Sequence, residues 1–293
     1  MMKHFACGFV LLLLSLTAIP GAWGSPQEKP LVFGFTPVVL DTDFTLVSGF
    51  LKYLENQMGI PIVPAHRKTY KEILGLLKYG EVDFAWICGY PFISNQKDLE
   101  LVSVPIFQGK PYYQSYLIVA RSAPYSSWDD LKGKIHAFSD PDSNSGHLVP
   151  RYELAKRGGI PEQYFSKFLF TYSHENVVNA VVQGLVDSGS VDGYIWELLN
   201  RNKDSLQNQT RIIHRSDYYG FPPIVTRKFY PKEKVEKFRH ALEQMKKNPQ
   251  GRLILEKFGL DGFQQAQPEL FESIQSAQRF VDEFQKKFMA DNR

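Results

Sequence analysis

The residues best suited to chemistry form one short run between a predicted strand and a predicted helix: Ser139-Asp140-Pro141-Asp142-Ser143-Asn144-Ser145-Gly146-His147. Backbone N–H groups at a helix start have no partner within the helix, and the helix dipole favours negative charge there. The side chains of Ser143, Asn144 and Ser145 add further donors, so the run predicts an anion site. The alternative is an ordinary helix N-cap, which needs only one of these side chains.

His174 and three tyrosines are candidate ligands for the same anion. His174 follows Ser173, a predicted N-cap, and a ring N–H at a helix start can point at an oxyanion. Tyr70, Tyr113 and Tyr194 each lie close to a predicted strand end or helix start, where a phenol can donate to a phosphoryl oxygen. The alternatives are a solvated or capping histidine and tyrosines that belong to the core or rim.

The sequence holds no pattern typical of a catalytic or metal centre. A nucleophilic Cys88 would need a nearby base and a lowered pKa, so we interpret this strand-end cysteine as a buried small hydrophobic residue. The seven histidines include no i,i+4 pair and no cysteine partner at zinc-site spacing. These observations predict a protein that is not an enzyme and binds no metal.

Charge and composition narrow the class of partner. The 293 residues carry a formal net charge of +3, which gives no broad basic surface of the kind that duplex nucleic acid requires. Aromatic residues make up 14% of the chain, enough to build a core and also to line a pocket. We therefore expect no nucleic-acid partner and a small-molecule ligand.

The N-terminus predicts export. Met1–His4 is positively charged, Phe9–Ile19 is apolar, and residues 22–24 fit a small-x-small cleavage pattern, so we predict a signal peptide over residues 1–24. The rival interpretation is an uncleaved anchor, but the apolar run is short for a membrane span. Ser25 would be the first mature residue, and the mature protein is expected to be soluble and periplasmic.

Two series of alternating strands and helices predict two α/β lobes, because strands separated by helices build parallel sheets. The first series has strands at 31–35, 60–64 and 82–87 and helices at 44–57 and 70–77. The second has strands at 116–120, 134–138, 191–196 and 211–213, helices at 148–157 and 175–183, and a helix start at 127–131. From residue 231 the chain is predicted to be helical to its end, and its last apolar face, residues 270–284, to dock on the first lobe.

We place the crossings between the lobes near residues 113–116 and 215–218. Lobe 1 then comprises residues 25–115 and 217–293, and lobe 2, inserted into it, comprises residues 116–216. A ligand held between hinged lobes lies where strand ends and helix starts converge.

Several stretches occur in the order typical of one family. They are Tyr70-x-x-x-Leu74…Gly80-x-Val82-Asp83-x-Ala85-Trp86, Asp129-x-Leu131-x-Gly133-Lys134, Asp140-Pro141-x-Ser143-x-Ser145-Gly146-x-x-x-Pro150, Ser173-His174-Glu175 and Gly184-x-Val186-Asp187. Together they resemble the phosphonate/phosphite-binding (PhnD-like) proteins of ABC importers over nearly the whole mature chain. The Asp-Pro-x-Ser-x-Ser-Gly motif with its downstream Ser-His is the most specific part of the resemblance.

The resemblance implies a type II periplasmic-binding-protein fold, no cofactor, and a monomer that delivers a small phosphorus oxyanion to an ABC permease in the inner membrane. It also implies that Ser143, Ser145 and the amide between them hold the phosphoryl oxygens. His174 would complete this cradle, and Tyr70 and Tyr113 would approach from the first lobe. The alternative function is a ligand-sensing subunit of a membrane signalling system that uses the same fold.

The chain departs from the family pattern at two places. Asn144 stands where relatives often carry Thr, and Ile87-Cys88-Gly89-Tyr90 replaces a Gly-Pro turn after the strand. An amide can still donate to an oxyanion, so Asn144 changes geometry more than ligand class.

The expected ligand follows from the lack of a predicted carboxylate that could pair with a ligand ammonium. Relatives that take aminoalkyl phosphonates carry carboxylates for the ammonium, whereas the corresponding stretches here hold Tyr194 and Phe221-Pro222-Pro223. Asp192 and Glu197 are nearby, but the sequence does not give the direction of their side chains. Because an unpaired buried ammonium is costly, we expect phosphite, phosphate, methylphosphonate or a close analogue.

Overall fold

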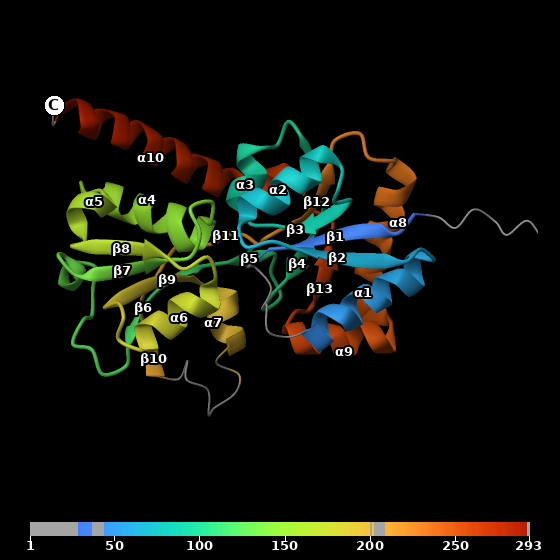
Figure 1. The fold of residues 1–293 in the computed structure, drawn as a ribbon, viewed down its shortest axis with the longest axis horizontal. Helices are drawn as coiled ribbons and strands as arrows, with labels where there is room; N and C mark the ends of the chain where they lie inside the picture. Colours follow the sequence, from blue (N-terminus) through green and yellow to red (C-terminus); the bar gives the residue numbers. More distant parts are fainter. Residues whose placement is uncertain (1–28, 37–43, 200, 202–208, 292–293) are drawn as a thin grey trace, which may run out of the picture.

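The computed structural model describes residues 29–36, 44–199, 201 and 209–291. The predicted signal peptide, residues 1–24, and Ser25 lie outside the described residues. Two open sheets with flanking helices form two lobes side by side (Figure 1). The predicted α/β class with two lobes is confirmed.

The larger lobe is built on six strands. They are β1 (Leu31–Phe35), β2 (Ile62–His66), β3 (Phe84–Trp86), β4 (Leu99–Ile106), β12 (Ile224–Arg227) and β13 (Gly262–Gln264), in the order β13-β4-β12-β3-β1-β2. β1 is parallel to β2 and β3, and β12 is antiparallel to β3 and β4. The helices of this lobe are α1 (Phe44–Met58), α2 (Tyr70–Tyr79), α3 (Gly89–Ser94), α8 (Lys232–Gln244) and α9 (Pro249–Phe258).

Aromatic rings fix the helices of this lobe to its sheet. Phe84 of β3 and Phe238 of α8 stack with ring centroids 4.0 Å apart, and Phe33 of β1 lies 5.9 Å from Phe238. Phe50 of α1 meets Phe33 edge to face at 5.7 Å. All four side chains are fully buried, and burial of such large apolar areas stabilises the layer that positions the ends of β1 and β3.

The smaller lobe is built on five strands. They are β6 (Ser115–Ala120), β7 (Ile135–Phe138), β8 (Lys167–Phe170), β9 (Ser188–Asp192) and β10 (Thr210–Arg215), in the order β10-β6-β9-β7-β8. β7 is parallel to β8 and β9, whereas β6 is antiparallel to β9 and β10. The helices are α4 (Val149–Lys156), α5 (Pro161–Tyr164), α6 (His174–Val182) and α7 (Gly193–Leu199).

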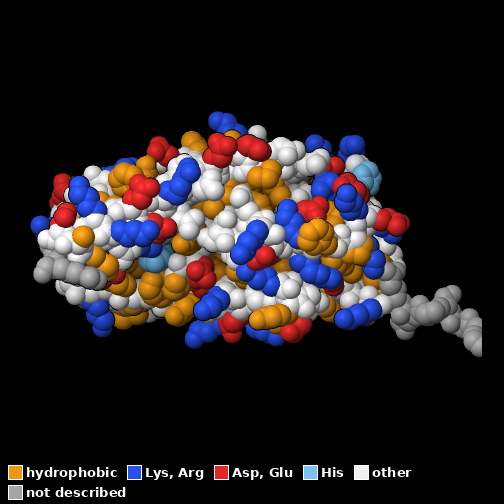
Figure 2. Space-filling view, turned by 90° about the horizontal axis from the view of Figure 1, so that it is seen from above, with side chains coloured by type: hydrophobic (Ala, Val, Ile, Leu, Met, Phe, Trp, Pro, Cys, Tyr) orange, Lys and Arg blue, Asp and Glu red, His pale blue; other side chains and the backbone are white. Residues whose placement is uncertain are grey.

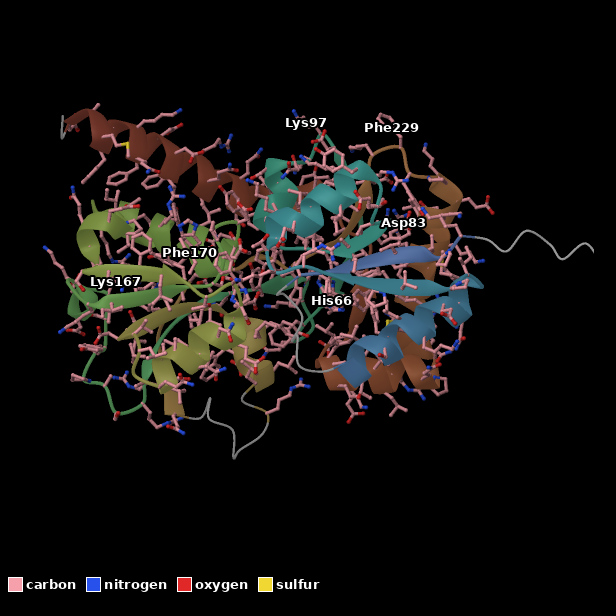
Figure 3. All side chains as sticks on the ribbon, in the orientation of Figure 1. His66, Asp83, Lys97, Lys167, Phe170 and Phe229 are labelled. Atoms are coloured by element: carbon pink, nitrogen blue, oxygen red, sulfur yellow. The ribbon has the colours of Figure 1, made fainter. Side chains whose placement is uncertain are left out.

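The carboxyl ends of the parallel strands in both sheets face the boundary between the lobes. In Figure 3, β8 runs from Lys167 toward the larger lobe and ends at Phe170. His66, the last residue of β2, lies on the side of the larger lobe that faces the smaller lobe. Ligands of open α/β sheets bind outside the carboxyl ends of the strands. A ligand site is therefore expected at this edge of the two sheets.

Capped helices carry two of the candidate residues. Thr69 is the N-cap of α2 and forms a capping box with Glu72, so Tyr70 is the first helical residue. Ser173 is the N-cap of α6, its side chain accepts from the Asn176 N–H, and His174 is the first helical residue. The predicted cap at Ser173 is confirmed, and both candidates project from defined helix starts.

A two-stranded antiparallel sheet joins the lobes. Its strands are β5 (Tyr112–Tyr113) and β11 (Tyr219–Gly220), close to the two predicted crossings. The strands of the larger sheet come from residues 31–106 and 224–264, and those of the smaller sheet from residues 115–215. The residue limits of the lobes given above stay a prediction.

Three predicted elements differ from the structure. The strand predicted at 191–196 ends at Asp192, because the Asp192 carboxylate accepts from the N–H groups of Tyr194 and Ile195 and starts α7. The helix start predicted at 127–131 is only a 3₁₀ turn, Asp129–Leu131. The chain after residue 231 is interrupted by β13, which pairs with β4.

The sequence predicts that the last helix, α10 (Glu272–Asp291), docks on the first lobe. The structure confirms this for the start of the helix, but its later part contacts the smaller lobe. Ile274 packs against Gly89 of α3 in the larger lobe. Farther along, Phe280 meets Tyr152 of α4 edge to face at 5.3 Å, and Gln285 accepts a hydrogen bond of 2.6 Å from Arg151. A helix of 20 residues spans about 30 Å, so it reaches over α4 of the smaller lobe (Figure 1).

The surface mixes charges of both signs. On the face shown in Figure 2, Lys and Arg side chains are interspersed with Asp and Glu, and neither sign covers a large area. Among the described helices, none combines the length and the apolar character needed to cross a bilayer.

A closely packed glycine of the smaller lobe and an open glycine of the larger lobe test the packing described. A Cβ added at Gly189 of β9 would lie 2.4 Å from Cγ1 of Val177, whereas one at Gly75 of α2 meets nothing within 4 Å. Gly189→Ala should lower the free energy of unfolding by about 1–3 kcal/mol through overpacking. Gly75→Ala should raise it by about 0.5–1 kcal/mol. Urea unfolding of both variants checks this, and equal stabilities would contradict the packing described.

Candidate functional site

The predicted anion run lies at the carboxyl end of β7 and faces the larger lobe. Its residues Asn144–Leu148 form a π-helical turn that leads directly into α4. Ser143 is the N-cap of this turn, because its Oγ accepts from the Gly146 N–H at 3.0 Å. A Cβ at Gly146 would lie 1.9 Å from Oγ of Ser139, so this position admits only glycine. The N-cap alternative therefore accounts for Ser143 but not for its neighbours.

Asn144 bridges the two lobes. Its Nδ2 donates to the Tyr113 hydroxyl at 2.9 Å, and its backbone N–H donates to Sγ of Cys88 at 3.2 Å. Cys88 follows β3 of the larger lobe, and all three residues are almost completely buried. The backbone amide between Ser143 and Ser145, predicted to hold a phosphoryl oxygen, thus contacts the opposite lobe in this conformation.

Ser145 has a buried hydroxyl that the fold itself does not use. Its Oγ lies beside the Tyr113 hydroxyl but forms no hydrogen bond of good geometry with any described residue. Its backbone oxygen accepts from Oγ of Ser115 at 2.6 Å, which fixes the turn. A buried donor without a partner is available to a ligand oxygen.

His174 presents one ring N–H to the same space. Its Nδ1 accepts from the backbone N–H of Asp192 at 3.1 Å, so Nδ1 carries no proton. Burial lowers the pKa of His174 to about 3, which keeps the ring neutral at pH 7 with its proton on Nε2. Nε2 lies 3.5 Å from the Tyr70 hydroxyl of the opposite lobe.

Tyr70 and Tyr113 close the site from the larger lobe and the hinge. Both side chains are at most 2% exposed, and burial raises the pKa of each phenol well above its ordinary value, so both hydroxyls stay protonated. The Tyr70 backbone N–H also lies 3.4 Å from Oδ2 of Asp140 in the anion run. Six of the seven predicted residues therefore meet at one boundary, namely Tyr70, Tyr113, Ser143, Asn144, Ser145 and His174.

Tyr194, the seventh, turns away from this group. Its hydroxyl donates to the backbone oxygen of Phe258, at the end of α9, at 2.9 Å. Its ring packs edge to face against Phe107 and Phe221 at 5.3 and 5.1 Å. Tyr194 thus ties the smaller lobe to the larger one in this conformation, and its hydroxyl is already engaged.

The sequence did not give the direction of the Asp192 side chain, and the structure does. Asp192 is 1% exposed, and its Oδ2 has no hydrogen-bond partner among the described residues. Cys88 is buried as predicted, and burial raises the pKa of its thiol to about 11, which keeps it protonated and unsuited to nucleophilic attack. The strand predicted at 191–196 places Asp192 near its start, whereas Asp192 is the last residue of β9.

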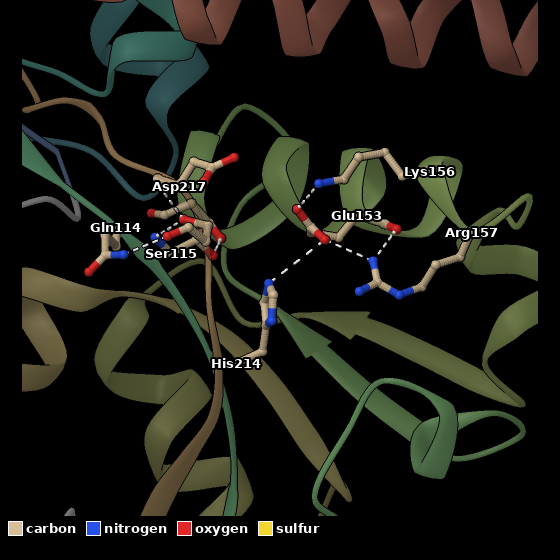
Figure 4. Close-up of polar contacts among 9 residues, drawn as sticks. Gln114, Ser115, Glu153, Lys156, Arg157, His214 and Asp217 are labelled. Carbon is tan, nitrogen blue, oxygen red and sulfur yellow. Dashed lines mark hydrogen bonds and ion pairs between the residues drawn. The ribbon is translucent and has the colours of Figure 1, made fainter.

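The hinge touches the anion run through Ser115, the first residue of β6. Besides the bond to Ser145, its backbone N–H donates to Oγ of Ser216 on the second crossing at 2.9 Å. Figure 4 shows Gln114, Ser115 and Asp217 at the hinge beside an ion-pair cluster of the smaller lobe. In that cluster Glu153 contacts Lys156, Arg157 and His214 at 2.6, 2.8 and 3.7 Å.

Comparison with known proteins identifies the family. A family model described as ABC transporter, phosphonate, periplasmic substrate-binding protein matches residues 33–271. The chain belongs to this family. Its members are binding proteins for transport rather than enzymes, and the family implies a small ligand, a membrane permease and a periplasmic location. The sensing alternative is therefore not favoured.

Two named relatives are similar in sequence. One is the phosphonates-binding periplasmic protein of Escherichia coli (strain K12), which is 25% identical over 254 residues, 83% of this chain and 74% of the relative. The other is the probable ABC transporter phosphite binding protein PhnD1 of Prochlorococcus marinus (strain MIT 9301). It is 24% identical over 203 residues, 63% of this chain and 66% of the relative.

Solved structures confirm the type II periplasmic-binding-protein fold. A binding protein component of an ABC phosphonate transporter from Pseudomonas aeruginosa superposes with a TM-score of 0.83 at 23% identity, covering 89% of each chain. PhnD1 of Prochlorococcus marinus in complex with methylphosphonate superposes with a TM-score of 0.76 at 18% identity, covering 87% of this chain and 98% of that chain. At these identities the likeness establishes the fold alone.

Ser143 and Ser145 should differ in what they do for stability. Ser143→Ala removes the N-cap and should lower the free energy of unfolding by about 1 kcal/mol. Ser145→Ala removes a hydroxyl without a partner and should leave the stability unchanged within about 0.5 kcal/mol or raise it. Urea unfolding in a buffer without oxyanions checks this. A loss in Ser145→Ala as large as that in Ser143→Ala would show that its hydroxyl already has a partner.

Proposed function

We propose that this protein captures a small phosphorus oxyanion, namely phosphite, phosphate, methylphosphonate or a close analogue, and delivers it to the permease of an ABC importer in the inner membrane. In this proposal the chain is exported by a cleaved signal peptide, residues 1–24, and acts as a monomer. The observation that carries the proposal is the pair of buried donors on the smaller lobe, Oγ of Ser145 and Nε2–H of His174. At the lobe boundary the Ser145 hydroxyl has no hydrogen-bond partner among the described residues, and Nε2 of His174 has only a long contact of 3.5 Å with the Tyr70 hydroxyl.

The donors come from both lobes, so ligand binding is coupled to closure of the lobes. Ser145, His174 and the amide of Asn144 belong to the smaller lobe, while the Tyr70 hydroxyl comes from the larger lobe and that of Tyr113 from the hinge strand. An oxyanion contacts all of them only when the lobes are together. It therefore stabilises the closed form by population shift, the state that a permease can distinguish from the open form.

The donor set favours a small tetrahedral anion. The groups are neutral hydroxyl, imidazole and amide donors, and none of the side chains that carry them is Lys or Arg. Tyr70 and His174 approach to 3.5 Å across the boundary, and Asn144 bonds directly to Tyr113. A ligand with a large substituent would separate these contacts, whereas three phosphoryl oxygens would take them over.

A thermal-shift panel on the exported protein tests the proposal, with phosphite, phosphate, methylphosphonate, 2-aminoethylphosphonate and sulfate. A ligand present at about 100 times its Kd adds about 2.7 kcal/mol of stability, which raises Tm by several degrees for a chain of this size. Ser145→Ala should lose about 10-fold or more in affinity, because it removes a hydrogen bond to a charged group. Absence of a shift with every phosphorus oxyanion would refute the proposed ligand class.

Labelling of Cys88 by a thiol reagent tests the closing motion separately. Cys88 is the only cysteine of the predicted mature chain and is fully buried where the lobes meet. Saturating methylphosphonate should slow labelling by about tenfold or more, because it shifts the population toward the closed form. Ser145→Ala at the same ligand concentration is the control and should label faster. Equal rates with and without ligand would contradict closure around the site.

A further inference from the structure

Asp192 places a carboxyl group in the proposed anion site, where negative charge is least expected. Its Oδ1 accepts from the N–H groups of Tyr194 and Ile195 at 2.9 and 3.3 Å, as the side chain of a helix N-cap does. Its Oδ2 takes no part in that cap and has no hydrogen-bond partner among the described residues. The N-cap interpretation therefore explains one oxygen and leaves the other unexplained.

The groups around Asp192 are neutral. His174 of α6 is neutral and accepts from the Asp192 N–H, while the thiol of Cys88 and the phenols of Tyr70, Tyr113 and Tyr194 are buried and protonated. Asp192 raises the pKa of Cys88, Tyr70 and Tyr113 electrostatically, so its carboxyl lies close to the site they enclose.

Other charged groups nearby are already engaged. Beyond Tyr194, Arg201 donates to the backbone oxygen of Glu256 at 3.0 Å. In the anion run, the Asp140 carboxylate accepts from the backbone N–H groups of Tyr70 and Asp142. Burial raises the pKa of Asp192 to about 7, since no basic side chain is among the groups that lower it.

A carboxylate and an oxyanion can share such a site only if a proton lies between them. We propose that Oδ2 of Asp192 and one oxygen of the bound ligand share a single proton, so that the site selects oxyanions able to carry a proton near neutral pH. This inference rests on the proposed function. The proton is donated either by P–OH to the carboxylate or by the carboxylic acid to P–O⁻, and the two forms contain the same atoms and charge. Phosphite, phosphate and monosubstituted phosphonates meet this condition, whereas sulfate carries no proton at this pH.

The sign of the pH dependence follows from the proton count. The complex holds one proton between ligand and Asp192. Above the second pKa of the ligand and the pKa of Asp192, neither free partner holds that proton, so binding takes it from solvent. The affinity should then fall about tenfold for each pH unit. Sulfate brings no proton, so its affinity should already fall above the pKa of Asp192.

Calorimetric titration of the exported protein with methylphosphonate and with sulfate between pH 6 and 9 tests the inference. The wild type should lose about tenfold in methylphosphonate affinity per pH unit at the upper end. Asp192→Asn keeps the cap at Oδ1 and offers a permanent N–H donor. It should therefore remove this decline and improve sulfate affinity by about tenfold or more at pH 8 relative to wild type.

Asp142→Asn is the matched control, because it removes a carboxylate of the anion run that is half-buried and has no contact with the cradle among those described. It should keep the wild-type pH profile. Should Asp192→Asn fail to fold, the proton uptake of the wild type decides, measured from binding heats in two buffers of different ionisation enthalpy. One proton taken up at pH 9 is the expected result, and none would overturn the inference.

Two outcomes would overturn the proton-sharing inference. The first leaves the proposed function intact, whereas the second also contradicts the proposed preference for a ligand without an ammonium. One is methylphosphonate binding whose pH profile is the same in wild type and Asp192→Asn. The other is 2-aminoethylphosphonate binding at least about tenfold tighter than methylphosphonate and lost in Asp192→Asn, because Asp192 would then be an ionised partner of an ammonium. Absence of binding by any phosphorus oxyanion at every pH would instead refute the proposed function and the inference with it.

Discussion

The rest of the structure is arranged around polar atoms that are buried where the lobes meet and have no hydrogen-bond partner in the described part of the chain. They are Oγ of Ser139, Oδ1 of Asn144, Oγ of Ser145 and Oδ2 of Asp192, each without a hydrogen-bond partner among the described residues. Leaving such an atom buried and unpaired costs about 1–3 kcal/mol. A tetrahedral oxyanion with one proton can satisfy donors and acceptors of this set together.

The surrounding elements hold the donors at fixed places. Tyr70 and His174 are first residues of capped helices, and Gly146 lets the anion run pass against Ser139 where a side chain would collide. Ser115 ties the hinge to Ser145, so the crossing between the lobes and the anion run are one hydrogen-bonded unit. Sites on defined helix starts and strand ends are more precise than sites on free loops.

The sequence was informative where the signal was local. The strand Leu31–Phe35, the cap before His174, and the run around Ser145 are set by neighbouring residues and could be predicted. The direction of Tyr194, the second oxygen of Asp192 and the reach of α10 over α4 depend on packing between distant segments. A periodic pattern shows which face of a helix is apolar, but it does not show which lobe covers that face.

The central claim is that the ligand is held by neutral donors at the lobe boundary, and a crystal structure of the exported protein with methylphosphonate tests it most directly. The account predicts phosphonate oxygens within hydrogen-bond distance of Oγ of Ser145, Nε2 of His174 and Oδ2 of Asp192, with the lobes closed around them. Methylphosphonate bound elsewhere, for example in the aromatic pocket lined by Tyr112, Tyr116 and Tyr218, would contradict the account.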